Sequence, residues 1–131
     1  MPEKAAPHIL YVEDDQEFRS QMSQFFANEG FDVSTVPDDD QAIELIDTGI
    51  AIDALVTDNA FHPGRRDAKG AIRILDHLSD KDILIPTISF GNEFMKYLGV
   101  EANVTFDLLK GDFDGLRAAL KTIKDSRKLI G

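Results

Sequence analysis

Short apolar segments alternate with amphipathic helical patterns along this chain. Each apolar segment has the length of a buried strand, and each is followed by apolar residues spaced three and four apart, as on one face of a helix. The predicted strands are residues 9–12, 31–36, 52–58, 83–90 (interrupted by Pro86) and 104–109. Such alternation predicts an α/β fold: a doubly wound, five-stranded parallel sheet with right-handed crossovers and helices on both faces.

The predicted helices each carry one apolar stripe. They cover residues 15–29, a segment that ends at Gly49, residues 70–79, a short segment at about 93–98 and a last segment that begins at Asp112. Gly30 and Gly49 occupy the position at which helices commonly end. The residues expected to face the core are Phe18, Met22, Phe25, Phe26, Ala42, Ile43, Ile46, Ile72, Leu75, Leu78, Leu116, Leu120 and Ile123.

The length and composition favour a single cytoplasmic domain. We expect residues 1–7 of the 131-residue chain to form a flexible tail and residues 8–131 to form the folded domain. A formal net charge of −10 argues against direct binding to nucleic acid or to an anionic membrane. The absence of cysteine excludes disulfides and thiolate metal sites and suits the cytoplasm. No apolar run approaches the roughly 20 residues that span a bilayer.

Charged side chains follow three of the predicted strands. Glu13 and Asp14 come directly after the first strand, Asp58 ends the third, and Lys110 follows the fifth. Ligands bind at the carboxyl edge of an open α/β sheet, because strand ends and helix N-termini meet there. Carboxylates gathered at this edge repel one another, and a divalent cation with oxygen ligands relieves the repulsion. Mg²⁺ suits such a site.

Asp58 in this setting is a candidate nucleophile toward phosphorus. A carboxylate beside Mg²⁺ and an ammonium group can attack a phosphoryl group and form an acyl phosphate. The metal and Lys110 would then stabilise the charge on the oxygens of the transferring group. Taken singly, each acid is better explained as a solvated loop acid, and Lys110 as a surface lysine. Their coincidence at three strand ends favours a site.

From residue 9 to residue 130 the sequence resembles a response-regulator receiver domain, which implies a flavodoxin-like fold of the receiver type. The run Ile9-Leu10-Tyr11-Val12-Glu13-Asp14-Asp15 is similar to the acidic strand end of that family. The resemblance implies that Glu13 and Asp14 bind Mg²⁺ and that Asp58 accepts a phosphoryl group.

Two further positions match the family's site. The resemblance implies that Ala60, two residues after Asp58, contributes its backbone carbonyl to the metal. It also implies that Lys110 is the family's active-site lysine, at the usual separation from Asp58.

The loop after Asp58 departs from the family pattern. Receivers usually carry a proline four residues after the phosphoacceptor and a glycine four beyond it. Here Pro63 comes at five and Gly70 seven later, so the loop is longer. Arg65 and Arg66 within it are adjacent cations on an acidic protein. We expect them to meet a partner that delivers phosphate, the alternative being two solvated charges without a role.

The positions that relay the signal in receivers also differ. By ungapped count the Thr/Ser switch position falls on Gly91, which has no hydroxyl, and Ser89 serves only if strand four is realigned by two residues. The switch aromatic position falls on Asp107, with Phe106 one residue away. Lys110-Gly111 replaces the usual Lys-Pro and lacks the help of proline toward a cis bond. The resemblance thus implies an intact acidic site with an altered relay.

The function that the resemblance implies is two-component signalling rather than enzyme catalysis. Asp58 would take a phosphoryl group from a histidine kinase or phosphotransfer protein, and the domain would act on a downstream protein or effector domain. The alternative is a pseudo-receiver, a protein-interaction module that signals without phosphorylation.

Other site chemistries fit the sequence less well. A dehalogenase-like phosphatase would need a second aspartate where Ala60 stands. No glycine-rich loop precedes Lys-Ser or Lys-Thr, and the acids after strand one would repel a flavin phosphate. The three histidines are too scattered in the sequence to indicate zinc.

Overall fold

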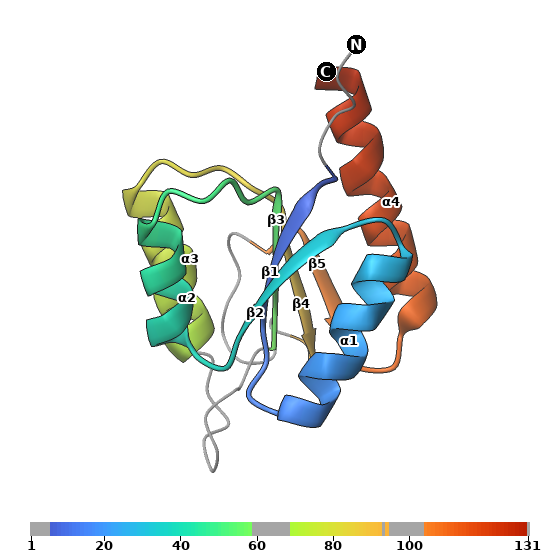
Figure 1. Ribbon diagram of the computed structural model, residues 1–131, viewed down its shortest axis with the longest axis horizontal. Helices are drawn as coiled ribbons and strands as arrows, with labels where there is room; N and C mark the ends of the chain where they lie inside the picture. Colours follow the sequence, from blue (N-terminus) through green and yellow to red (C-terminus); the bar gives the residue numbers. More distant parts are fainter. Residues whose placement is uncertain (1–5, 59–68, 93, 95–103, 131) are drawn as a thin grey trace.

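The computed structural model describes residues 6–58, 69–92, 94 and 104–130, the last four by their backbone alone. Its centre is a five-stranded parallel sheet in the order β2-β1-β3-β4-β5 (Figure 1). The strands are β1 (His8–Val12), β2 (Asp32–Val36), β3 (Ala54–Thr57), β4 (Thr87–Gly91) and β5 (Phe106–Leu109). The predicted doubly wound α/β architecture is confirmed.

Helices cover both faces of the sheet. Those within the described residues are α1 (Gln16–Asn28), α2 (Asp39–Asp47), α3 (Lys69–Asp80) and α4 (Phe113–Ile130). The helices α1 and α4 pack on one face, and α2 and α3 pack on the other (Figure 1). In the described part of the chain, no helix is both long and apolar enough to cross a bilayer.

Each face of the sheet has its own apolar layer, and β1 shows why. Successive side chains of a strand point to opposite faces. Ile9 and Tyr11 therefore pack with α1 and α4, while Leu10 and Val12 pack with α2 and α3. All four are buried. Burial on both faces explains why this strand is a continuous apolar run rather than an alternating one.

Local sequence signals mark the ends of the first two helices. Asp15 caps α1 by accepting a hydrogen bond from the backbone N–H of Phe18, and Asp38 caps α2 by accepting one from Gln41. Gly30 follows α1 at a φ of +90°, a left-handed conformation that only glycine adopts at little cost. These turns direct the chain back to the next strand.

The strand order determines where a ligand site can form. From β1 the chain crosses over through α1 on one face, and from β3 it crosses over through α3 on the other. The connections diverge, so a crevice opens between the carboxyl ends of β1 and β3. Val12 pairs with Thr57 in the parallel register, and the next residues, Glu13 and Asp58, leave the sheet side by side.

The predicted starts of β4 and β5 were wrong. β4 begins at Thr87 rather than at residue 83, and Leu84 is 94% exposed. Pro86 has no N–H to donate to a ladder, so pairing begins only after it. β5 likewise begins at Phe106 rather than at residue 104.

Two predicted core residues were also wrong. Ile72 is 37% exposed, and Ile74, two residues later, is buried instead. Two residues of a helix are about 200° apart, so Ile72 and Ile74 lie on nearly opposite sides of α3. Ile43 is only half-buried, while Leu45 packs on the α2/α3 layer. The short helix predicted near 93–98 falls on residues outside the described ranges.

Candidate functional site

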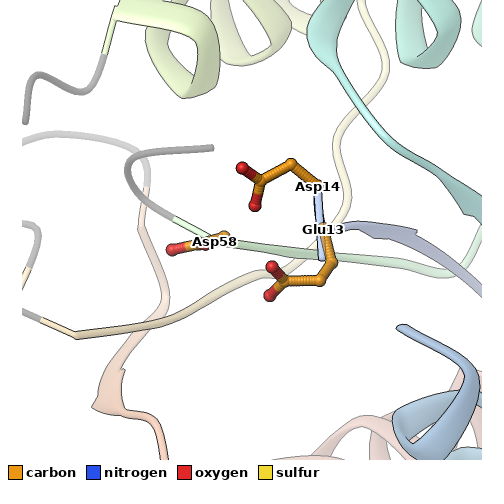
Figure 2. A group of neighbouring side chains, drawn as sticks. All are labelled: Glu13, Asp14 and Asp58. Atoms are coloured by element: carbon orange, nitrogen blue, oxygen red, sulfur yellow. The ribbon is translucent and has the colours of Figure 1, made fainter. Parts of the chain in front are cut away.

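Three carboxylates meet at the carboxyl edge of the sheet. Glu13 and Asp14 follow β1, Asp58 follows β3, and one oxygen of each lies within 4.8 Å of the others (Figure 2). Glu13 is 0% and Asp58 is 4% exposed, whereas Asp14 is open to solvent. The sequence placed these acids at neighbouring strand ends, and the structure brings them together.

The two adjacent acids leave the chain in opposite directions (Figure 2). Side chains alternate along an extended segment, so Glu13 shares the face of Tyr11, on the α1/α4 side. Asp14 projects from the opposite side and is exposed. The carboxylate of Glu13 is therefore enclosed by protein, whereas that of Asp14 is in contact with solvent and can exchange water for a ligand.

Lys110 joins the two buried acids. It lies just after β5, and its Nζ is 2.9 Å from Oε2 of Glu13 and 3.1 Å from Oδ2 of Asp58. Its backbone N–H donates to the carbonyl of Gly91 at 2.8 Å, which ties the end of β5 to the end of β4. The ammonium also lies 4.9 Å from the ring centroid of Phe18, within range of a cation–π contact.

Burial and charge act against each other at Lys110 and Glu13. Burial alone would lower the pKa of Lys110, but the charges and hydrogen bonds of Asp58 and Glu13 outweigh it and raise that pKa. Burial, followed by the charge of Asp58, raises the pKa of Glu13 to about 7, against the opposing influence of Lys110. The site therefore holds one carboxyl group that titrates near neutrality.

The segment that carries Glu13 is held at several atoms. Oε1 of Glu13 accepts from the backbone N–H of Asp15 at 3.2 Å, and Oε2 lies 3.4 Å from the hydroxyl of Tyr11. Nη1 of Arg19, from the first turn of α1, donates to the Glu13 carbonyl at 2.7 Å. The bend between β1 and α1 is thus fixed from both ends.

The residues at the predicted switch positions lie on β4 and β5. Thr57 pairs with Ser89, so Ser89 is one residue inside the level of Asp58, and Gly91 is the last residue of β4. The hydroxyl of Ser89 is buried and has no hydrogen-bond partner among the described residues. Phe106 packs on the α1/α4 layer, whereas Asp107 pairs with Ser89. Ser89 and Gly91 therefore lie one residue before and one residue beyond the level of Asp58, and the assignment of the switch position to either stays a prediction.

Several predicted site residues are not described. Ala60, whose carbonyl was expected to bind metal, and the loop cations Arg65 and Arg66 lie outside the described residues. The peptide between Lys110 and Gly111 is trans, since the described residues include no cis bond, and Gly111 has a φ of +97°.

The contacts of Tyr11 and Arg19 with Glu13 were missed at the level of sequence. For Tyr11 a signal existed: it stands two residues before Glu13, and the two-residue period of a strand puts both side chains on one face. Arg19 offered only a weak signal, because the geometry of the bend decides which backbone carbonyl its guanidinium reaches.

The donor set suits a hard divalent cation. Carboxylate oxygens are the ligands that Mg²⁺ and Ca²⁺ prefer, and a shallow site with one exposed acid leaves room for the waters that Mg²⁺ retains. A lysine within reach of the same oxygens supplies a second positive charge. Such an arrangement can stabilise a dianionic group held beside Asp58.

Comparison with known proteins identifies the fold. No family model and no curated protein matches the sequence. The receiver domain of the Francisella response regulator 1452 matches with a TM-score of 0.73 and 21% identity, over 92% of this chain and 98% of that one. The signal receiver domain of a LuxO-type repressor protein from Vibrio parahaemolyticus matches with a TM-score of 0.75 and 18% identity, over 95% and 94%.

A third solved structure with the same fold contains a bound ligand. The response regulator TrrA from Thermotoga maritima, in complex with Mg²⁺-BeF, matches with a TM-score of 0.70 and 18% identity, over 89% of this chain and 98% of that one. Matches at such low identity establish a shared fold. The acidic cluster of this chain lies at the edge of the sheet where β1 and β3 end. The chain has the fold of a response-regulator receiver domain.

Proposed function

We propose that this domain accepts a phosphoryl group on Asp58 in a Mg²⁺-dependent reaction, as part of two-component signal transduction. The observation that carries the proposal is the convergence of four charged side chains at one strand edge, with Lys110 in contact with both buried acids. The donor would be a histidine kinase or a phosphotransfer protein. The relative from Thermotoga maritima, which shares the fold and was solved with Mg²⁺-BeF, supports this assignment.

The chemistry assigns a role to each side chain. An oxygen of Asp58 forms the new bond to phosphorus while the bond between phosphorus and the imidazole nitrogen of the donor breaks, and its electron pair returns to that nitrogen. Lys110 is 3.1 Å from Asp58 and can turn to an oxygen of the incoming group. Bound Mg²⁺ would supply further charge stabilisation to the phosphoryl oxygens.

The exposed and buried acids would share the metal unequally. Asp14 is exposed and suited to direct coordination, with Asp58 and the backbone carbonyl of Ala60 completing the protein ligands. Glu13 is buried and already accepts hydrogen bonds at both oxygens. It would therefore act partly through water, as Mg²⁺ keeps several waters in most protein sites.

Intact mass spectrometry tests the proposal. Incubation with acetyl phosphate and Mg²⁺ should yield a species heavier by roughly 80 Da, one phosphoryl group. The adduct should be absent without Mg²⁺ and absent from Asp58→Asn, while Asp76→Asn on the outer surface of α3 serves as the matched control and should be labelled normally. An adduct that persists in Asp58→Asn would place the phosphate elsewhere.

A pseudo-receiver is the second candidate function, and one observation favours it. Gly91 ends β4 without a hydroxyl, so nothing at that position can report a phosphoryl group on Asp58. Under this alternative neither acetyl phosphate nor beryllofluoride would modify or bind the protein, and partner binding would be the same in wild type and Asp58→Asn. Labelling of Asp58 together with weaker partner binding by Asp58→Asn would reject it.

A further inference from the structure

A tyrosine lies directly beneath the acidic site. The side chain of Tyr11 is completely buried in the α1/α4 layer, and its ring meets the ring of Phe26 edge to face at a centroid distance of 5.3 Å. Its hydroxyl is 3.4 Å from Oε2 of Glu13. The rest of β1 is apolar apart from His8 at its start, so this is the one polar atom that the core side of the strand directs at the site.

Oε2 of Glu13 is shared between a fixed donor and a movable one. Lys110 reaches it at 2.9 Å and reaches Asp58 as well. The Tyr11 hydroxyl contacts the same oxygen at the long end of the hydrogen-bonding range, as expected for an acceptor that an ammonium already occupies. The lysine stands on a long flexible stem at the end of β5, whereas the buried ring of Tyr11 cannot withdraw.

The sharing matters once Lys110 leaves Glu13. If the ammonium turns to a phosphoryl group on Asp58, the donors left to the Glu13 carboxylate among the described residues are the N–H of Asp15 and the hydroxyl of Tyr11. A buried carboxylate that loses a hydrogen-bond donor is destabilised, which favours a different side-chain rotamer. Glutamate also has one more rotatable bond than aspartate, so an anchor at Oε2 removes freedom that would otherwise oppose metal binding.

We propose that Tyr11 is a positioning residue of the metal site: its hydroxyl holds Glu13 toward the bound Mg²⁺ and takes over from Lys110 when the lysine moves to the phosphoryl group. The part that concerns Lys110 rests on the proposed function of Asp58. Burial, together with the charges of Glu13 and Asp58, raises the pKa of Tyr11 far above its usual value. The hydroxyl therefore remains a proton-bearing donor.

The first test compares Tyr11→Phe, which removes only the hydroxyl, with Tyr97→Phe at the chain's other tyrosine. Calorimetric titration with MgCl₂ should show a Kd about tenfold higher for Tyr11→Phe, the lower end of the effect of removing a hydrogen-bond partner of a metal ligand. Tyr97→Phe should bind as the wild type does. A Kd for Tyr11→Phe within twofold of the wild type would overturn the proposal.

The same comparison in a Lys110→Ala background separates positioning from a structural role. There Tyr11 is the remaining side-chain donor to Oε2 among the described residues, so Tyr11→Phe should raise the Mg²⁺ Kd by a larger factor than it does beside Lys110. A hydroxyl that merely supports the fold would change Kd by the same factor in both backgrounds, and that result would count against the proposal.

Tyrosine emission gives a readout that does not depend on the stability of Tyr11→Phe. The chain has no tryptophan and two tyrosines, so Tyr97→Phe leaves Tyr11 as the only emitter. Mg²⁺ should change its emission with the Kd measured by calorimetry, because metal binding alters the hydrogen bond to Glu13. Emission that does not respond to saturating Mg²⁺ would refute the contact.

Labelling of Asp58 is scored separately. Altered Mg²⁺ binding by Tyr11→Phe without phosphorylation of the wild type would leave the positioning role in place and reject the phosphoacceptor. Normal labelling of the wild type, together with unchanged Mg²⁺ binding by Tyr11→Phe, would keep the phosphoacceptor and reject the positioning role.

Discussion

The two halves of the carboxyl edge differ in what they retain. At the ends of β1 and β3 the acids Glu13, Asp14 and Asp58 lie close together, and Lys110 reaches across from β5 to contact Glu13 and Asp58. On β4 and β5, in contrast, the ungapped count predicts Gly91 and Asp107 at the positions where receivers carry a hydroxyl and an aromatic ring. Under the proposed function, the β1/β3 half would carry the phosphoryl chemistry and the β4/β5 half would carry an altered relay.

The difference shows that the two tasks have separate physical requirements. Binding a cation and a phosphoryl group needs charges at fixed distances, which strand register and burial supply. A relay needs an element with two packings and a ligand that favours one of them. The hydroxyl of Ser89, which has no hydrogen-bond partner among the described residues, lies two residues before Gly91, so a phosphoryl contact there requires β4 to shift against β3.

The largest expected effect concerns the acidic half. Asp14→Ala should weaken Mg²⁺ binding by about 3 kcal/mol, the upper end for an interaction with a charged group, because it removes a direct ligand. Glu13→Ala should cost less, since Glu13 is buried and already hydrogen-bonded. Calorimetric titration of both variants measures the difference, with thermal unfolding in EDTA as the control for folding. The reverse order would mean that Glu13 is the direct ligand.

The second prediction concerns the altered half. A missing charge-assisted hydrogen bond of about 1.5–3 kcal/mol removes most of the bias that a phosphoryl group could place on the relay. Backbone amide NMR with and without beryllofluoride should therefore show changes confined to the surroundings of Asp58. Large changes across residues 96–116 would contradict the comparison. Ser89→Ala is then the deciding control, because the loss of those changes would show that Ser89 has taken over the role.

The third prediction concerns the pH dependence of Mg²⁺ binding at the β1/β3 half. The pKa of Glu13 is raised to about 7 in the folded, metal-free protein, and Mg²⁺ competes with its proton. Between pH 6 and pH 8 the Mg²⁺ Kd should therefore fall by about tenfold.

The raised pKa of Glu13 also affects the stability of the metal-free protein: a rise in pH strengthens Mg²⁺ binding but lowers this stability. A raised acid pKa means that the folded state binds the proton more tightly than the unfolded state does. Stability should therefore decline as the pH rises from the unfolded value near 4.5 to about 7. Thermal unfolding in EDTA and in Mg²⁺ across this range measures both effects, and Glu13→Gln should abolish them.

The smallest expected effect concerns the two arginines that follow Asp58 in the sequence. Replacing Arg65 and Arg66 by serine should slow phosphotransfer from a protein donor by a few-fold, since exposed ion pairs contribute about 0–1 kcal/mol each. Labelling by acetyl phosphate should be unchanged, because a small donor needs no docking surface. Equal rates with the protein donor would identify both arginines as solvated charges.

The alternation of apolar segments and helical patterns was sufficient to predict the architecture. Periods of two and 3.6 residues are local properties of the chain, and the right-handed crossover rule leaves few ways to connect five parallel strands. The edge at which Glu13, Asp58 and Lys110 meet followed from the same rule, because the carboxyl ends of parallel strands share one edge. The helix starts at Asp15 and Asp38 and the helix end at Gly30 are equally local, since each residue acts on its own turn of helix.

Only the tertiary structure decided how these residues are used. Which of two adjacent acids is buried depends on the face that β1 presents to α1 and α4, and this puts Glu13 above Tyr11 and leaves Asp14 in solvent. The register between β3 and β4 set the level of Ser89, and the phase of α3 chose Ile74 over Ile72. Burial, register and the reach of Lys110 are relations between segments distant in the chain. No local pattern contains them, because each is fixed only when the layers pack together.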